Sequence, residues 1–470
     1  MTEAQRHSPG YAWAHAHLLG GRDAVAAWAF QEKLERSQWH SHRQHLAFQL
    51  KHVGELLKHA VANVPFFRNM PEAVAAANMR ELDLKTFRRI PLQTRRHLQE
   101  HKAALTAVRV PPHHGSSTVA KSSGSTGAPV ETLVTELAGA WNRALLLRGH
   151  LWAYDRFDGR MAVIRRYKRG NADFPDGLMR PSWNDEMTLP FTTGTAFGLN
   201  AGATVAEQVE WLNHVQPAAL FTYPTQLAAL LGAAAHGQLK LPDLQYIMTI
   251  SETLDDDVRE QARRIFDIEI FDAYSANETG AIAFQCPDAP GYHIQSESVL
   301  VEILNDDGEP CAPGETGRVV LTLLHSYAFS LIRYDIGDLA TVGRYCRCGR
   351  GLPVLDRIIG RQRNMMIGPN GARFRPSLGW RRIRTIAPIL QGQFVQHAIP
   401  KLEARLVVER PLTSEEEDAV RKHLRSRMPQ LETVDFTYVS EIPRSDSGKF
   451  EDFVTLVKTD RPADEVGVGQ

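Results

Sequence analysis

KSSGSTGAP, residues 121–129, is the most informative segment of the chain. Its serine and threonine side chains offer consecutive hydroxyl groups, and its glycines let the backbone fold closely around an anion. A triphosphate would fit such a loop. The segment differs from the usual P-loop, because no Gly-Lys-Ser/Thr sequence follows at the right spacing and no strand clearly precedes it. A flexible linker rich in glycine and serine is the alternative interpretation.

Four further segments follow this one in a fixed order. DAYSANETG (272–280) comes after a predicted strand and contains a carboxylate near its end, and RYDIGD (333–338) presents another. Gly360-Arg361 opens a smaller domain, and PRSDSGK (443–449) places a lysine on a tight turn near the end of the chain. Any one of these segments could arise by chance, whereas all five in this order rarely would.

Together the five segments resemble the core motifs of the adenylate-forming superfamily, which includes acyl-CoA synthetases, peptide-synthetase adenylation domains and luciferases. Within it, the sequence is most similar to the phenylacetate–CoA ligase group, which also contains coenzyme-F390 synthetase-like and capsule-biosynthesis proteins. The resemblance covers nearly the whole chain, beginning with the helical segment LLKHAVANVPFF at residues 56–67. Asn277 departs from the pattern, since Ser or Thr is usual there, although its amide can still donate to phosphate.

Length and composition indicate a globular protein of two or more domains. At 470 residues the chain exceeds the ~250–300 residues at which a single hydrophobic core stops growing. Lys plus Arg equals Asp plus Glu at 54 each, so no net field would draw the protein onto nucleic acid or an anionic membrane. Residues 1–30 lack the form of a secretory signal, and no segment reaches the ~18 apolar residues needed to cross a bilayer. We therefore expect a cytoplasmic protein without a membrane span.

Helical patterns alternate with short β-rich runs, which predicts an α/β fold with parallel sheet and covering helices. A helical layer comes first, from about Ser37 to Val64, and Pro65 ends it. The runs that favour parallel strands are Met161–Ile164, Ala219–Tyr223, Tyr246–Ile250 and Ile268–Asp272. The runs that favour an antiparallel subdomain are Glu302–Leu304, Gly317–Leu324 and Ser330–Tyr334.

The pattern changes after Gly360, where we place a domain boundary. Beyond it, strands are predicted near Phe394–Ala398, Glu403–Val408 and Phe436–Val439, and a helix near Ser414–Arg427. The resemblance implies that residues 1–360 form a large N-terminal adenylation domain of several subdomains. It also implies that residues 361–470 form a small, mobile α+β C-terminal lid. In the superfamily this lid rotates between two half-reactions, and the pivot would lie near Arg361.

The resemblance implies a nucleotide site built from distant segments. Attack of a carboxylate on the α-phosphate of ATP builds up negative charge, so the reaction needs cations and aligned donors. Glu278 would anchor Mg²⁺, a hard ion that prefers oxygen ligands. Asp338 would accept both ribose hydroxyls, with Arg361 beside it. Lys449 would bridge the attacking carboxylate and the α-phosphate as a point charge. For each of these charged residues the alternative is a solvated surface side chain.

The other residues carried over from the motifs fall into two groups. The first would hold the β- and γ-phosphates and consists of Ser122, Ser123, Gly124, Ser125, Thr126 and Gly127, with Asn277 beside them and Thr126 also assigned a catalytic role with Glu278 and Lys449. The second would enclose the adenine and consists of Ser251, Glu252, Asp272, Ala273 and Tyr274, the last by stacking.

Cys286, His293, Cys346 and Cys348 form a candidate metal site. Three thiolates and an imidazole make the closed tetrahedral set that zinc prefers in structural sites. The alternative is two unrelated loops with buried thiols, because the Cys-x-Cys spacing is tighter than that of the common zinc knuckle. Four cysteines are too few for a disulfide-built scaffold of this size, and Cys311 is expected to be a free thiol.

Three functional hypotheses remain at this point. The first is an ATP-dependent carboxylate–CoA ligase that uses ATP, Mg²⁺ and CoA and acts on an aromatic acid, with structural zinc and a homodimer as a possible assembly. The second keeps adenylation but passes the acyl group to an amine or a carrier-protein thiol. The third is a catalytically inactive, zinc-stapled interaction protein of the same fold. The acid pocket is expected around Phe191, Thr192, Thr193 and Phe197, and nothing in their order identifies the acid.

Overall fold

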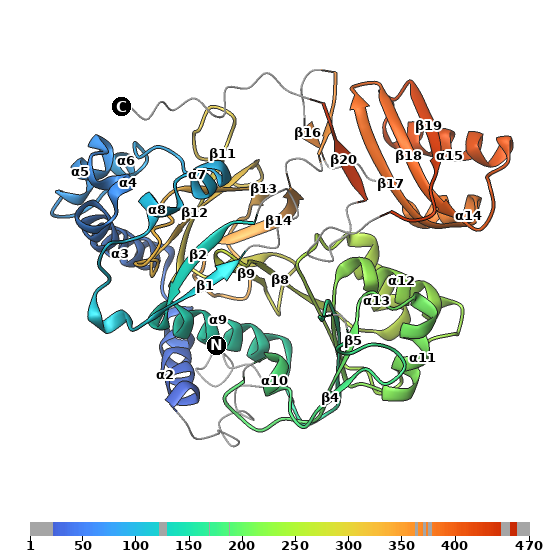
Figure 1. Cartoon of the computed structure of the whole chain (residues 1–470), viewed down its shortest axis with the longest axis horizontal. Helices are drawn as coiled ribbons and strands as arrows, with labels where there is room; N and C mark the ends of the chain where they lie inside the picture. Colours follow the sequence, from blue (N-terminus) through green and yellow to red (C-terminus); the bar gives the residue numbers. More distant parts are fainter. Residues whose placement is uncertain are drawn as a thin grey trace. The chain divides into compact units, whose positions relative to one another are not determined.

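The computed structural model describes residues 22–121, 129–168, 170–187, 189–361, 365–369, 373–374, 378–442 and 452–457. The chain divides into two compact units, residues 1–358 (unit 1) and residues 359–470 (unit 2), shown in Figure 1. Each unit has its own hydrophobic core. The units are therefore described separately.

Unit 1 begins with a helical layer in two long pieces. The helical run expected from Ser37 to Val64 is interrupted, because α2 (Arg22–Ser37) ends where it was expected to start and α3 (His42–Asn63) begins after Ser41. A capping box fixes this start: the Ser41 hydroxyl accepts from the Gln44 backbone N–H, and the Gln44 side chain accepts from the Ser41 N–H. The layer is completed by α4 (Pro65–Arg68), α5 (Pro71–Ala77), α6 (Leu84–Phe87), α7 (Arg95–Glu100) and α8 (Lys102–Leu105).

A mixed sheet of twelve strands forms the centre of unit 1, in the order β11-β12-β13-β14-β10-β9-β8-β7-β6-β3-β5-β4. The inner strands β5, β3, β6, β7 and β8 are parallel, and antiparallel pairing begins where β9 meets β8. The α/β fold class is confirmed, but the antiparallel strands continue the same sheet instead of forming a separate one. The bounds are β3 (Met161–Arg165), β4 (Leu178–Arg180), β5 (Ala196–Asn200), β6 (Ala219–Thr222), β7 (Tyr246–Ile250), β8 (Ile270–Ala276), β9 (Gly280–Gln285), β10 (Tyr292–Ile294), β11 (Val299–Leu304), β12 (Thr316–Leu323), β13 (Tyr334–Val342) and β14 (Val354–Arg361).

Helices cover both faces of the parallel strands, and the side chains of those strands alternate between two cores. On β3, Met161 and Val163 pack into the core beneath α2 and α9 (Glu136–Ala153). Ala162 and Ile164 pack into the core formed with α11 (Val205–Val215), α12 (Pro224–Ala235) and α13 (Asp256–Phe266). Figure 1 shows these three helices grouped beside the parallel strands, which explains why the runs read as continuously apolar.

The antiparallel half of the sheet packs against the helical layer. Val53, Leu56 and Leu57 of α3 share one core with Val299 of β11 and Leu321 of β12. The strand expected at Ser330–Tyr334 was placed too early, because β13 begins only at Tyr334. Arg333 has a φ of +52°, a left-handed conformation that interrupts regular strand geometry.

A two-stranded antiparallel pair, β1 (Ser117–Lys121) and β2 (Glu131–Thr135), leads into α9. Thr135 caps that helix, since its hydroxyl accepts from the Ala138 N–H at 3.2 Å. Residues Ser122–Gly127 connect the two strands and lie outside the described residues. A strand does therefore precede the hydroxyl-rich segment.

Unit 2 contains a four-stranded mixed sheet in the order β19-β18-β17-β20. Its core includes Phe394 and Leu402 from the sheet and Val420 and Leu424 from α15 (Ser414–Arg427), the helix that was expected at those residues. The other elements are α14 (Trp380–Ile386), β15 (Met366–Ile367), β16 (Arg373–Phe374), β17 (Ile389–Ala398), β18 (Lys401–Val408), β19 (Thr433–Tyr438) and β20 (Phe453–Thr455).

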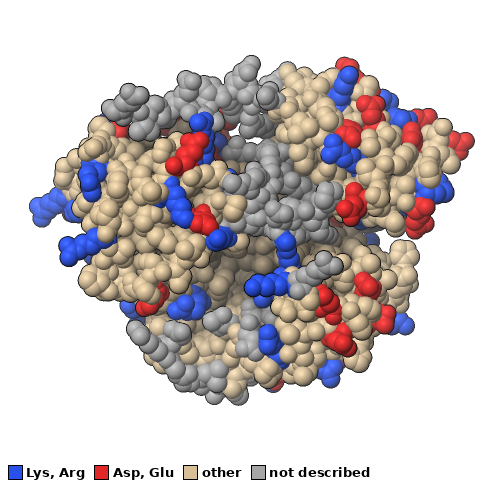
Figure 2. Space-filling model, viewed as in Figure 1, with Lys and Arg blue, Asp and Glu red and all other residues tan. Residues whose placement is uncertain are grey.

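Charges of both signs are spread over the visible face of the molecule, where Figure 2 shows lysine and arginine interspersed with aspartate and glutamate. The chain as a whole carries equal numbers of basic and acidic residues, and the mixture on this face agrees with that balance. None of the helices in the described residues is both long enough and apolar enough to pass through a bilayer.

A buried ion pair links α2, α9 and the segment before β11. Arg148 Nη2 lies 2.9 Å from Glu297 Oε2, with the Arg148 side chain fully buried and that of Glu297 5% exposed. Ser37, at the end of α2, also donates its hydroxyl to Glu297. Burial is the largest influence on the pKa of Glu297 and acts to raise it, but the charge of Arg148 and the hydrogen bonds from Arg148 and Ser37 together bring the pKa below its ordinary value. The carboxylate is therefore charged and depends on Arg148.

We predict that Arg148→Met lowers the free energy of unfolding by about 3–5 kcal/mol, because it leaves a buried carboxylate without its counter-ion. Urea denaturation followed by tryptophan fluorescence measures the change. Arg156→Met is the matched control, since Arg156 pairs with Asp158 on the surface, where solvent screens the charges, and it should leave the free energy of unfolding nearly unchanged. The double variant Arg148→Met/Glu297→Met should recover most of the loss. Equal stability of the two single variants would contradict the prediction.

Candidate functional site

The carboxyl ends of the parallel strands meet at one edge of the sheet, and several predicted site residues lie there. The register pairs Thr222 with Thr249 and Ile250 with Ala273, so Ser251 and Tyr274 lie just beyond the same row. Open α/β sheets bind ligands at this edge. The pairing of β6, β7 and β8 thus brings together residues that the sequence separates.

Ser251 forms a tight turn directly after β7. Its φ is +72°, which an L-residue rarely adopts, and the Glu252 N–H donates to the Ile250 carbonyl at 2.9 Å. The Glu252 carboxylate is held in turn by the Thr225 N–H at 3.1 Å, at the start of α12. Strained backbone of this kind concentrates at functional sites, which supports a binding role for the turn.

Tyr274 and Asp338 connect the parallel half of the sheet to the antiparallel half. The Tyr274 hydroxyl donates to Asp338 Oδ2 at 2.7 Å. Tyr274 is 9% exposed and Asp338 is 6% exposed. Two residues predicted to contact the nucleoside are therefore brought into direct contact.

Glu278 lies in the turn between β8 and β9 and is 5% exposed. Arg95 Nη1, from the start of α7, lies 3.7 Å from Glu278 Oε1, and the Tyr334 hydroxyl donates to the same oxygen at 3.5 Å. Asn277 donates its side-chain amide to the carbonyl of Lys121 at 3.4 Å. The predicted magnesium ligand therefore adjoins the strand that leads into the hydroxyl-rich segment.

Asp272 belongs to an internal network instead of presenting its carboxylate to a cleft. It accepts from the Thr249 hydroxyl at 2.6 Å and from the Tyr292 hydroxyl at 2.7 Å. Burial raises the pKa of Asp272, although these hydrogen bonds and the charge of Arg259 oppose the shift. Any contact with adenine is better assigned to the backbone near Asp272 and Ala273 than to this side chain.

Ser122–Gly127 and Lys449, two parts of the predicted site, lie outside the described residues. Arg361 is the last residue of β14 and belongs to unit 2, whereas Asp338 belongs to unit 1. The roles assigned to these residues stay predictions. In the expected acid pocket, Phe191 is fully buried against Phe157, with ring centroids 4.8 Å apart, so it is part of the core.

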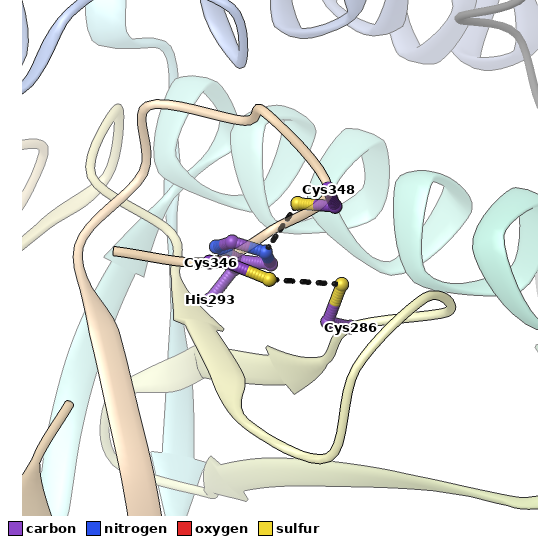
Figure 3. Close-up of side chains that lie close together, drawn as sticks. All are labelled: Cys286, His293, Cys346 and Cys348. Carbon is purple, nitrogen blue, oxygen red and sulfur yellow. Dashed lines mark hydrogen bonds between the residues drawn. The ribbon is translucent and has the colours of Figure 1, made fainter. Parts of the chain in front are cut away.

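Cys286, His293, Cys346 and Cys348 converge, as Figure 3 shows. Their ligand atoms all lie within 4.8 Å of one another. Cys346 Sγ is 3.7 Å from Cys286 Sγ, and His293 Nε2 is 3.2 Å from Cys348 Sγ. Hydrogen bonds from Cys286 and His293 lower the pKa of the Cys348 thiol. Cys311 does not belong to the group.

Neighbouring groups fix the orientation of the cluster. The other ring nitrogen of His293, Nδ1, lies 3.3 Å from the Leu352 carbonyl, and backbone N–H groups of Asp288 and Arg350 point at Cys286 Sγ and Cys348 Sγ. The Arg350 guanidinium lies over the rings of Trp39 and Trp152. Outer contacts of this kind hold ligand side chains in position.

Sequence reasoning missed three residues that contact predicted site carboxylates: Arg95 and Tyr334 beside Glu278, and Tyr292 beside Asp272. Tyr334 lies inside the quoted RYDIGD segment, so its position was available. Arg95 occurs in a run of basic residues and carries no local signal that separates it from Arg96.

Two segments of the chain match known protein families. Residues 181–322 match the AMP-binding enzyme family, and residues 374–455 match the CapK C-terminal domain. A phenylacetate-coenzyme A ligase from Thermus thermophilus is 23% identical over 68% of this chain and 71% of its own length. The Escherichia coli phenylacetate-coenzyme A ligase is 24% identical over 68% and 72%. The chain is thus similar to AMP-binding, adenylate-forming enzymes and to the CapK C-terminal domain over these segments, and it is a distant relative of phenylacetate-coenzyme A ligases.

Solved structures share the fold of this chain. A 2-hydroxyisobutyryl-CoA ligase in the postadenylation state, bound to 2-HIB-AMP, has a TM-score of 0.65 at 19% identity, covering 87% of this chain and 88% of that one. An anthranilate CoA ligase bound to anthranoyl-AMP has a TM-score of 0.51 at 16% identity, covering 71% and 65%. The large mixed sheet and the small C-terminal mixed-sheet domain are those of the adenylation fold.

We predict that Gly280→Ala destabilises the protein more than Gly308→Ala. Both glycines have a positive φ, +75° and +81°, so alanine costs about 1–2 kcal/mol at each. A methyl group at 280 would also collide with the Asn142 side chain, which accepts from the Ala281 N–H, whereas nothing lies within 4 Å at 308. Thermal unfolding should show the larger loss for Gly280→Ala, by roughly another 1–3 kcal/mol. Equal losses would mean that Asn142 does not hold this turn.

Proposed function

We propose that this protein is an ATP-dependent carboxylate–CoA ligase acting on an aromatic acid. The acid oxygen would attack the α-phosphate of ATP and expel pyrophosphate, and the acyl-adenylate would then react with the CoA thiol, releasing AMP. The observation that supports this most directly is the pair of buried carboxylates, Glu278 and Asp338, at the ligand-binding edge of the sheet. A buried carboxylate is costly unless polar or charged groups surround it, and here Arg95, Tyr334 and Tyr274 supply such groups. Two buried carboxylates at one edge of the sheet support a site for cations and polar ligands.

Each residue role follows from the charge that the reaction develops. Glu278 would hold Mg²⁺ on the phosphates, and Asp338 would accept from the ribose while Tyr274 positions it. Ser122–Gly127 would supply donors to the β- and γ-phosphates, with Thr126 closest to the reaction. Lys449 would place its ammonium between the attacking oxygen and the α-phosphate.

The two units would divide this work. Residues 1–360 would bind ATP and the acid, and residues 361–470 would act as a mobile lid that carries Lys449 and pivots near Arg361. Lids of this type exclude water during the first step and open a path for the second substrate. The division in the structure at residue 358 supports this assignment.

The choice of an aromatic acid rests on the relatives, two of which are named phenylacetate-coenzyme A ligases. A solved structure of the same fold is an anthranilate CoA ligase. The acceptor is proposed to be CoA for the same reason. If the acceptor were an amine or a carrier-protein thiol, the first half-reaction would be the same. Only the second half-reaction, the transfer of the acyl group, distinguishes these acceptors from CoA.

We predict that the protein catalyses acid-dependent ATP–pyrophosphate exchange and that Lys449→Ala reduces it by about 10²-fold or more without unfolding the protein. Lys401→Ala is the matched control in unit 2, because Lys401 is exposed on β18 and should leave exchange unchanged. A panel of aromatic and aliphatic acids identifies the substrate class, and CoA or hydroxylamine added afterwards distinguishes the acceptors. Failure of every acid in the panel would favour the inactive interaction protein.

We also propose that Cys286, His293, Cys346 and Cys348 bind structural zinc. With Zn–S bonds of about 2.3 Å, tetrahedral geometry sets sulfur atoms about 3.8 Å apart, and the Cys346–Cys286 separation is 3.7 Å. Four protein ligands leave no coordination position for water, so the ion would hold the loops before β10 and β14 together without taking part in the reaction.

We predict about one zinc ion per chain in the purified protein, measured by inductively coupled plasma mass spectrometry. Cys286→Ser should lose the ion and lower the melting temperature, because a serine hydroxyl is a poor substitute for a thiolate ligand. Cys311→Ser should keep both zinc and stability, since Cys311 lies outside the cluster. If the native protein contains no metal and Cys286→Ser does not change its stability, the zinc proposal is wrong and the cysteines are buried thiols without a metal.

A further inference from the structure

Arg95 is the cation nearest to Glu278 in the described ion pairs. Its Nη1 lies 3.7 Å from Glu278 Oε1, and the two side chains are 22% and 3% exposed. The pair is therefore largely removed from water, where a charge interaction is stronger than at the surface. None of the sequence motifs includes Arg95.

Gln93 fixes the backbone that carries Arg95. This side chain is 1% exposed, donates to the Ser330 carbonyl at 3.2 Å and accepts from the Ile332 N–H at 2.8 Å. Its backbone N–H donates to the Arg333 carbonyl at 2.9 Å, and its carbonyl accepts from the Asp335 N–H at 2.8 Å. Four hydrogen bonds thus tie the residue two before Arg95 to the segment that contains Tyr334 and leads to Asp338.

Thr94 continues this fixed geometry into α7. Its hydroxyl accepts from the His97 N–H at 3.3 Å, and the His97 ring accepts from the Thr94 N–H. Arg95, the first residue of the helix, directly follows these two anchored residues. Its direction toward Glu278 is a built feature of the chain and not a chance orientation of a surface side chain.

A magnesium ion at Glu278 would change what Arg95 contacts. Mg²⁺ is a hard ion that would bring phosphate oxygens to this carboxylate. Arg95 Nη1 lies 3.7 Å from the same carboxylate oxygen, so the ion and the guanidinium would share one neighbour. Two cations beside one carboxylate repel each other, and a phosphate oxygen that arrives with the ion relieves the repulsion.

We infer that Arg95 binds the β- and γ-phosphate oxygens of the Mg²⁺-bound ATP held at Glu278. This inference rests on the proposed function, since it assigns a further residue to the same nucleotide site. When the acid oxygen forms its bond to the α-phosphorus, the bond from that phosphorus to the bridging oxygen breaks and pyrophosphate leaves with the electron pair. The planar guanidinium suits bidentate contact with those oxygens and stabilises the charge that develops on them.

Arg96 provides a matched control at the next position. It is exposed, and its Nε lies 2.8 Å from Glu100 within the same helix. A substitution there removes an arginine from α7 without removing a neighbour of Glu278. The two variants have the same charge change and almost the same place in the sequence.

The test measures binding of Mg·ATP and of AMP to the full-length protein by isothermal titration calorimetry. Arg95→Ala should weaken Mg·ATP binding by about 10- to 100-fold, the usual effect of removing a charge-assisted hydrogen bond, while AMP affinity stays within about twofold. Arg95→Lys should recover part of the loss, because it keeps the charge without the fork. Arg96→Ala should bind both nucleotides like the wild type.

Two results would overturn the inference: Arg95→Ala binding Mg·ATP as tightly as wild type, or losing AMP affinity in the same proportion as ATP affinity. The second would mean that Arg95 supports the site as a whole and does not contact the terminal phosphates. Wild-type protein that binds Mg·ATP but activates no acid would refute the ligase proposal alone, because the ratio of ATP to AMP binding still reports on Arg95.

Discussion

The hydrogen bond that Tyr274 donates to Asp338 joins the last parallel strand to the antiparallel half of the sheet. Both side chains are almost fully buried, and an unmade hydrogen bond there would be costly. The bond therefore fixes the position of β13 relative to β8. Glu278 lies in the turn after β8, and Asp338 lies on β13. These two strands therefore also determine the distance between the two carboxylates of the proposed nucleotide site.

The helical layer holds this arrangement from outside the sheet. Arg333, whose backbone has a positive φ, donates to the Glu302 carboxylate at 3.0 Å and to the carbonyls of Arg88 and Ile90. Gln93 bonds to the residues on either side of it. A strained backbone persists only where its surroundings determine it, and here the N-terminal segment supplies them together with Glu302 of β11. The layer thus positions the site as well as covering the core.

Much of the fold follows from periodicity. The apolar runs of β3 and β7 are buried almost continuously, and α15 buries Val420 and Leu424, four residues apart on one face. The observed bounds of β7 and α15 agree with those expected. The errors lie where side chains or special backbone geometry override the pattern. The break between α2 and α3 depends on the Ser41 capping box, and the late start of β13 depends on the left-handed Arg333. Neither one changes the apolar spacing, so spacing could not reveal them.

The candidate site was predictable only where its chemistry is written in a short segment. Glu278, Asp338 and the cysteines stand in recognisable local patterns, and the structure brings the cysteines and His293 together although the chain separates them widely. Arg95 shows the limit, since it and Arg96 are identical as residues and adjacent in sequence. Their environments differ because a step of one residue rotates the side chain by about 100° around the helix axis, so Arg95 faces Glu278 and Arg96 faces Glu100. That difference is set by Gln93 bonding to residues more than 200 positions away, so it belongs to the tertiary structure and no local reading of the sequence contains it.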